Sequence, residues 1–116
     1  MYGIFNKRVF IMIKQIHIFI TNHLNYEMEA KIDFSSKKCL LNQKSYSISD
    51  SFLEQLLSIL SSFSNSVSSR NVIDAEECRI TIISDKVEKF SWKGKFPLKY
   101  LQLKELLGDL YDSKLS

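Results

Sequence analysis

Hydrophobic and polar residues alternate along several short segments of the chain, and this alternation predicts β-strands. Residues 26–34 are the clearest case, because every even position is apolar and the odd positions from 27 to 33 are charged. A period of two places one set of side chains in a core and the other in water. Further segments of this kind follow the same rule: residues 16–20, 37–41 and 44–48. The connections between them are short, so residues 14–48 are predicted to form an antiparallel meander.

A different spacing predicts a helix after residue 50. Ser51 is followed three residues later by Glu54, the arrangement of a capping box, in which both side chains satisfy free backbone N–H groups. Apolar residues then recur as on one helical face: Phe52, Leu53, Leu56, Leu57, Ile59, Leu60 and Phe63. This broad apolar face predicts that the helix lies across the sheet. The serine-rich stretch that follows favours a loop, so residues 64–76 are predicted to be irregular.

The last third of the chain predicts two strands and a second helix. Residues 78–82 alternate, and Asp85-Lys86 can turn the chain into a strand whose inner face carries Phe90 and Trp92. Pro97 fits the first position of a helix, with an apolar stripe at Tyr100, Leu103, Leu106, Leu107 and Leu110. The order of strands, helix, strand pair and helix predicts an α+β fold: an antiparallel sheet of about five strands with two helices packed on one side.

The composition is that of a single globular domain. The chain has 116 residues, of which 45% are hydrophobic and 25% charged, enough to bury a core without a metal or a disulfide. We therefore expect one domain over residues 1–116, and leave open whether residues 1–13 belong to its core. The apolar run after Lys7-Arg8 stops at Lys14, too short for a signal sequence or a membrane span. A cytoplasmic protein with reduced, structural Cys39 and Cys78 is the expectation.

Charge is unevenly distributed along the sequence. Residues 26–77 carry a net charge of −3, whereas residues 78–116 carry +3. The basic C-terminal third could face nucleic acid, but we favour lysines that solvate two strands and a helix. Between residues 86 and 96 the aromatic residues share one parity and Lys89, Lys93 and Lys95 the other, which predicts aromatics in the core rather than on a stacking platform.

No catalytic, cofactor or metal site is predicted. His17 lies in a strand segment and His23 in a turn, and no His or Cys pair has the short spacing of metal ligands. The exposed carboxylates of residues 27–33 are more simply explained as a solvated strand face that Lys31 partly neutralises.

The run from Phe90 to Tyr100, followed by residues 103–107, resembles the closing strand and helix of small bacterial immunity-type proteins. These are cytoplasmic partners that neutralise polymorphic toxins, including those of contact-dependent growth inhibition, and residues 26–63 fit the same layout. The resemblance implies a non-enzymatic protein, monomeric or weakly dimeric, that binds a cognate toxin domain and occludes its active site.

If the toxin is a nuclease, its cleft is basic, so carboxylates are the candidate contacts. They form two groups, one in a predicted loop and one on a strand face: Asp74, Glu76 and Glu77, and Glu27, Glu29 and Asp33. Two alternatives remain open: a small nucleic-acid-associated protein that uses the basic C-terminal third, and a secretion chaperone, normally dimeric. No membrane partner is expected.

Overall fold

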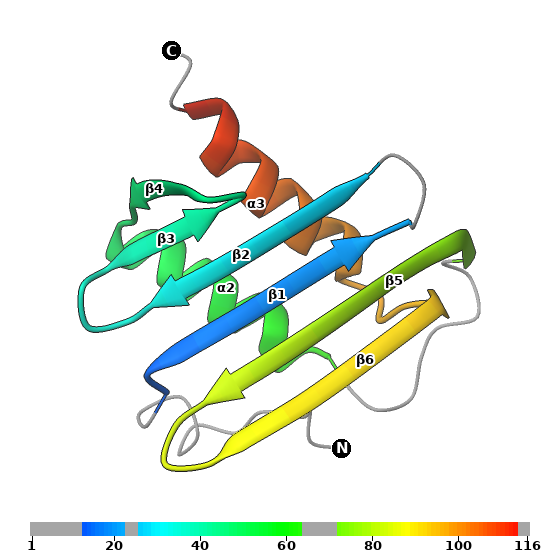
Figure 1. Ribbon diagram of the computed structural model, residues 1–116, viewed down its shortest axis with the longest axis horizontal. Helices are drawn as coiled ribbons and strands as arrows, with labels where there is room; N and C mark the ends of the chain where they lie inside the picture. Colours follow the sequence, from blue (N-terminus) through cyan, green and yellow to red (C-terminus); the bar gives the residue numbers. More distant parts are fainter. Residues whose placement is uncertain (1–12, 23–25, 64–71, 114–116) are drawn as a thin grey trace.

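The part of the chain that the structure describes forms a six-stranded antiparallel sheet with two helices on one face (Figure 1). The computed structural model describes residues 13–22, 26–63 and 72–113. Across the sheet the strand order is β4-β3-β2-β1-β5-β6. The elements are β1 (Gln15–Thr21), β2 (Glu27–Asp33), β3 (Lys38–Leu41), β4 (Lys44–Ser47), α2 (Asp50–Ser61), β5 (Val72–Ile83), β6 (Val87–Lys95) and α3 (Tyr100–Ser113). The predicted α+β architecture is therefore confirmed.

The core lies between the sheet and the helices, and β1 is at its centre. Ile16, Ile18 and Ile20 are fully buried on the helix side of β1. In register, Ile18 pairs with Ala30 of β2 on one side and with Ile80 of β5 on the other. Each fully buried isoleucine contributes roughly 1.5–3 kcal/mol relative to an exposed one. The alternation read from the sequence thus places the apolar side chains as predicted.

Helix α2 begins two residues earlier than the capping box predicts. Ser49, and not Ser51, is the N-cap, because its hydroxyl oxygen accepts a hydrogen bond from the backbone N–H of Phe52 at 3.1 Å. The Ser51 hydroxyl instead accepts from the side-chain amide of Gln55. The apolar face of α2 is nonetheless the predicted one, with Leu56 and Leu60 fully buried.

A two-residue turn fixes the register of β3 and β4. Asn42 and Gln43 both have positive φ, 48° and 71°, as a type I′ hairpin turn requires. The Asn42 side-chain oxygen also accepts a hydrogen bond from the backbone N–H of Glu29 at 2.9 Å. The turn is therefore tied to β2 as well as to its own hairpin, and the predicted pairing across it is confirmed.

Two boundaries in the second half differ from the predictions. Residues 72–76 belong to β5, so the irregular segment predicted for residues 64–76 is wrong over this part, and residues 64–71 lie outside the described residues. Helix α3 begins at Tyr100, whose N–H donates to the carbonyl of Pro97, so Pro97 precedes the helix.

The β5–β6 register shifts between Val72 and Glu77, near Gly94, whose φ of +77° favours glycine.

The two cysteines are buried, free thiols on separate strands. Cys39 lies on β3 and Cys78 on β5, with β2 and β1 between them. Strands lie about 4.8 Å apart, so the thiols are too distant for a disulfide. Burial raises the pKa of Cys39 to about 11 and that of Cys78 to about 12, so both stay protonated at neutral pH.

Ile13 is buried in the core, while residues 1–12 lie outside the described residues. Within the described ranges, neither helix is long and apolar enough to cross a membrane.

The packing of α2 predicts unequal costs for truncations of neighbouring leucines. Leu56→Ala or Leu60→Ala should lower the free energy of unfolding by about 2–5 kcal/mol, because each removes a fully buried side chain. Leu57 is only partly buried, contrary to the sequence prediction, so Leu57→Ala is the matched control and should cost less. Denaturant unfolding measures these differences. Losses below about 0.5 kcal/mol at both buried sites would contradict the layered core.

Candidate interaction surface

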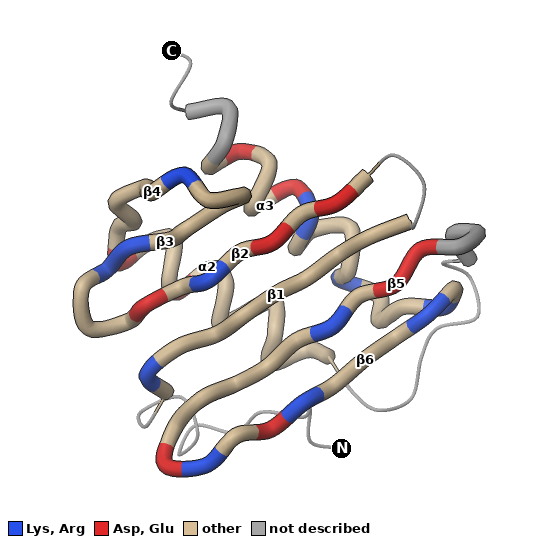
Figure 2. Tube along the Cα trace, in the orientation of Figure 1, with Lys and Arg blue, Asp and Glu red and all other residues tan. Residues whose placement is uncertain are grey.

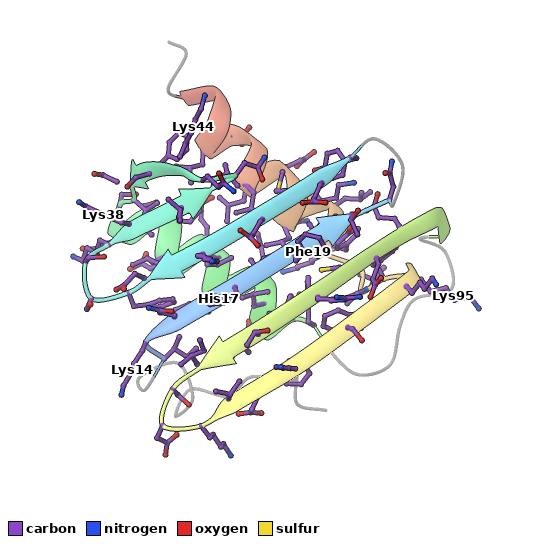
Figure 3. The ribbon with its side chains drawn as sticks, viewed as in Figure 1. Lys14, His17, Phe19, Lys38, Lys44 and Lys95 are labelled. Carbon is purple, nitrogen blue, oxygen red and sulfur yellow. The ribbon has the colours of Figure 1, made fainter. Side chains whose placement is uncertain are left out.

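The face of the sheet opposite the helices is the largest candidate site. No described helix or strand covers it, and its side chains come from alternate positions of all six strands (Figure 1). His17 and Phe19 lie on β1 near the middle of this open face, while Lys14, Lys38 and Lys95 lie around its margin (Figure 3). The alternation that buries the isoleucines of β1 turns His17 and Phe19 outward.

Four of the six predicted acidic residues lie on this open face. Glu27, Glu29 and Asp33 occupy alternate positions of β2, and Glu77 is at an outward position of β5. Thr21 of β1 pairs with Glu27 on one side and with Glu77 on the other. Residues from two distant parts of the sequence thus form one acidic row, which we define as Glu27, Glu29 and Glu77 with Asp33 at the far end of β2.

Asp33 also has a local structural role. Its Oδ1 accepts hydrogen bonds from the backbone N–H groups of Ser35 and Ser36 and from the Ser35 hydroxyl, and its Oδ2 accepts from Gln15. The bonds from Ser36 and Ser35 lower the pKa of Asp33. Because these bonds order the β2–β3 turn, Asp33 is less available to a partner than Glu27 and Glu29.

Glu76 is not a surface residue, and the predicted acidic loop is wrong. Glu76 lies on β5 with only 5% of its surface exposed, because alternation along the strand turns it inward and Glu77 outward. Its carboxylate accepts a hydrogen bond from the Tyr100 hydroxyl and forms an ion pair with Lys104 of α3, at 3.1 Å. The Lys104 ammonium also lies 5.3 Å from the ring centroid of Tyr26. Glu76 therefore joins β5 to α3; Asp74 also lies in β5, and its side chain is outside the described residues.

Basic side chains lie at the other side of the open face. Lys89 and Lys93 are at outward, exposed positions of β6, and Lys93 pairs in register with Glu77. Arg79 donates from Nε to the Glu77 carboxylate at 2.7 Å, while 60% of its side chain stays exposed. The outward charges are therefore mainly acidic on β2, where Lys31 lies among them, and basic on β6. Figure 2 marks the charged positions along these strands.

Of the predicted inward aromatic residues of β6, Trp92 lies in the core and Phe90 is partly buried against it. Trp92 is buried and packs edge-to-face on Phe63, with ring centroids 5.5 Å apart. Phe96 is fully buried and stacks on Tyr100 at 4.1 Å. The neighbouring lysines are on the other face, so these aromatics cannot form a stacking platform with them.

Phe19 and His17 were not predicted to belong to a binding surface. Their positions between the buried isoleucines of β1 indicate it, because alternate side chains of a strand point to opposite faces. Burial lowers the pKa of His17, with Lys31 acting in the same direction and Glu29 opposing, so the imidazole is neutral at pH 7. Phe19 is half-buried at an outward position of a central strand, and an aromatic side chain there favours contact with another macromolecule.

In the part of the chain that the structure describes, two hollows border the open face, and the larger, of about 540 Å³, lies at its margin beside Lys14, Gln15 and Phe34. A shallow hollow of about 200 Å³ lies beside Lys31, Asp33 and Leu40, smaller than the roughly 300–1,000 Å³ of small-molecule sites. Among the described residues, no group of three His, Cys, Asp or Glu side chains could hold a metal ion, and His23 lies outside them. Comparisons of the chain with protein-family models, with curated proteins and with solved structures found no match.

Two adjacent glutamates on opposite faces of β5 are predicted to differ in their contribution to stability. Glu76→Ala should lower the free energy of unfolding by about 3 kcal/mol, because the Tyr100 hydroxyl and the Lys104 ammonium lose their buried acceptor. Glu77→Ala removes the ion pair with Arg79, whose side chain is 60% exposed, and should cost about 1 kcal/mol. Thermal or denaturant unfolding of the two variants compares them. Equal losses would contradict the structural role of Glu76.

Proposed function

We propose that this chain is a non-enzymatic immunity protein that binds a cognate toxin domain through the open face of its sheet. The observation that carries the proposal is the acidic row, in which Glu27, Glu29 and Glu77 share one exposed face beside Phe19. The resemblance of residues 90–107 to immunity-type proteins supplies the class of partner. The mechanism is occlusion: the protein covers the active site of the toxin and carries out no reaction on it.

Electrostatics explains how such a face could select its partner. A toxin that cleaves nucleic acid has a positively charged cleft, and carboxylates complementary to it accelerate association and fix the orientation of the complex. Phe19 lies next to Glu29 in the β1–β2 register and supplies an apolar contact inside the charged row. An aromatic anchor with charged neighbours is the usual composition of a protein–protein contact with high energetic weight.

Nucleic acid is the second candidate, and one observation favours it. Phe19 pairs in register with Arg79, so an aromatic ring and a cation share the open face, as single-stranded nucleic-acid binding requires. The same ring, however, has Glu29 on its other side, and the acidic row would repel phosphates. A protein partner therefore fits the face better.

Co-expression tests the proposed function. The protein should restore growth of cells that express the toxin domain encoded next to it, and Glu27→Gln/Glu29→Gln should restore it less well, because two carboxylates leave the acidic row. Glu54→Gln is the matched control, since Glu54 is exposed on α2, away from the open face. Growth curves over a range of expression levels, with co-purification, measure the effect.

Two results would count against the proposal in different ways. Full protection by the double variant at every expression level would remove the acidic row from the contact. Failure of the unaltered protein to protect or to co-purify would reject the immunity function itself.

A salt titration tests the second candidate. The lysines of β6 should give only weak binding to RNA or duplex DNA, with an affinity that falls steeply as salt rises, because a few exposed phosphate contacts are screened and counterions are released. Fluorescence anisotropy of labelled oligonucleotides measures this. Sub-micromolar binding at physiological salt that disappears in a Lys89→Glu/Lys93→Glu/Lys95→Glu variant would instead establish the nucleic-acid function.

A further inference from the structure

The charged residues of the open face are arranged on the two sides of a line between β1 and β5, and the proposed function does not depend on this arrangement. Among the four long strands the order is β2-β1-β5-β6, and the line between β1 and β5 divides this set in half. Carboxylates lie on the outer strand of one half, at Glu27 and Glu29 of β2. Ammonium groups lie on the outer strand of the other half, at Lys89 and Lys93 of β6. With Lys31 and Asp33 included, the outward residues of β2 carry a net charge of −2, whereas those of β6 from Val87 to Lys93 carry +2. The two outer strands are therefore opposite in net charge at equal distances from the dividing line.

We propose that two copies of this chain dimerise face to face through their open sheets, about a two-fold axis parallel to the strands between β1 and β5. Rotation by half a turn about this axis places β2 of each copy over β6 of the other. Both acidic strands then meet lysines, so the contact is isologous and occurs twice. Two packed sheets lie about 10 Å apart, a distance that Glu and Lys side chains bridge from both sides.

The register gives the central contacts of the dimer. Rotation about this axis keeps each residue at its level along the strands. Phe19 and Arg79 form a pair at one level, so the ring of one copy meets the guanidinium group of the other, a cation–π contact. Glu27 and Lys93 lie at another common level, through Thr21 and Glu77, and meet as opposite charges.

One contact in the dimer is repulsive, and a substitution at this contact can test the arrangement. Lys31 and Lys89 share a level through His17 and Thr81, so two ammonium groups meet where the sheets stack. The dimer is therefore weak and sensitive to salt. The molecule measures 36 by 35 Å across its two longer axes, which leaves room for the roughly 800 Å² per partner of a stable interface. Edge-to-edge pairing of two β6 strands would instead place lysines against lysines.

Sedimentation analysis of the purified chain tests the dimer without any toxin. At low salt the mass should rise with concentration from 13.5 kDa toward twice that value, and return to 13.5 kDa at high salt. Lys31→Glu should tighten the dimer by about tenfold or less, because a like-charge contact becomes an attractive one. A wild-type chain that stays monomeric at low salt, or a Lys31→Glu chain that dimerises less, would overturn the proposal.

Charge reversal identifies the surface. Glu27→Lys/Glu29→Lys and Lys93→Glu should each be monomeric alone, because like charges then meet at the level of Glu27 and Lys93 in both halves of the interface. Mixed together they should form a heterodimer, since each altered strand meets an oppositely altered one. All three residues lie on the open face, and unchanged unfolding midpoints would exclude a folding defect. Dimers of either variant alone, or no heterodimer on mixing, would reject this interface.

The two proposals fail separately. Because the dimer covers the acidic row, it and a toxin complex would exclude each other, and only this consequence rests on the proposed function. A chain that protects cells but never dimerises loses the dimer alone, and one that dimerises but never protects loses the immunity function alone.

Discussion

The architecture of the described residues depends on one asymmetry: helices α2 and α3 cover one face of a six-stranded sheet, and no described helix or strand covers the other face. Every strand must therefore place apolar side chains toward the helices and polar ones away from them. Alternate side chains of a strand point to opposite faces, so the place of a residue along the strand decides whether it faces the helices, even when the residue is charged. Glu76 and Glu77 illustrate this, because adjacent identical residues become a buried ion-pair partner and a surface carboxylate.

Local patterns predicted the fold because most of its strands are short and strictly alternating. The faces of β1 and β2 followed directly from residues 16–20 and 26–34, and the hairpin at Asn42-Gln43 from its length. Boundaries failed where polar residues occupy regular structure. The first residues of β5 include acids that sequence alone assigns to a loop, and the contact that makes Glu76 structural comes from Tyr100 and Lys104 on a distant helix. No pattern in the neighbouring sequence predicts such a contact.

The candidate surface was predicted in parts but not as a whole. Parity placed Glu27, Glu29 and Asp33 on one face, yet it could not reveal that Glu77 joins them. That result depends on β5 lying beside β1, which is a property of strand order, and parity carries no information about strand order. The same alternation implied the outward position of Phe19. Its neighbours Glu29 and Arg79, which make it a candidate contact, come from other strands and follow only from the tertiary fold.

The strand order also has a consequence for how the chain reaches its native state. Strands β1 to β4 pair with sequence neighbours, whereas Ile18 of β1 pairs with Ile80, 62 residues further along the chain. Closing so long a loop lowers the entropy of the chain before the strand contacts stabilise it, and such non-local pairing slows folding. The N-terminal meander can therefore form early, while the docking of β5 onto β1 limits the rate. Until that step, β1 has a free apolar edge, and this nascent half-sheet is the species most exposed to aggregation.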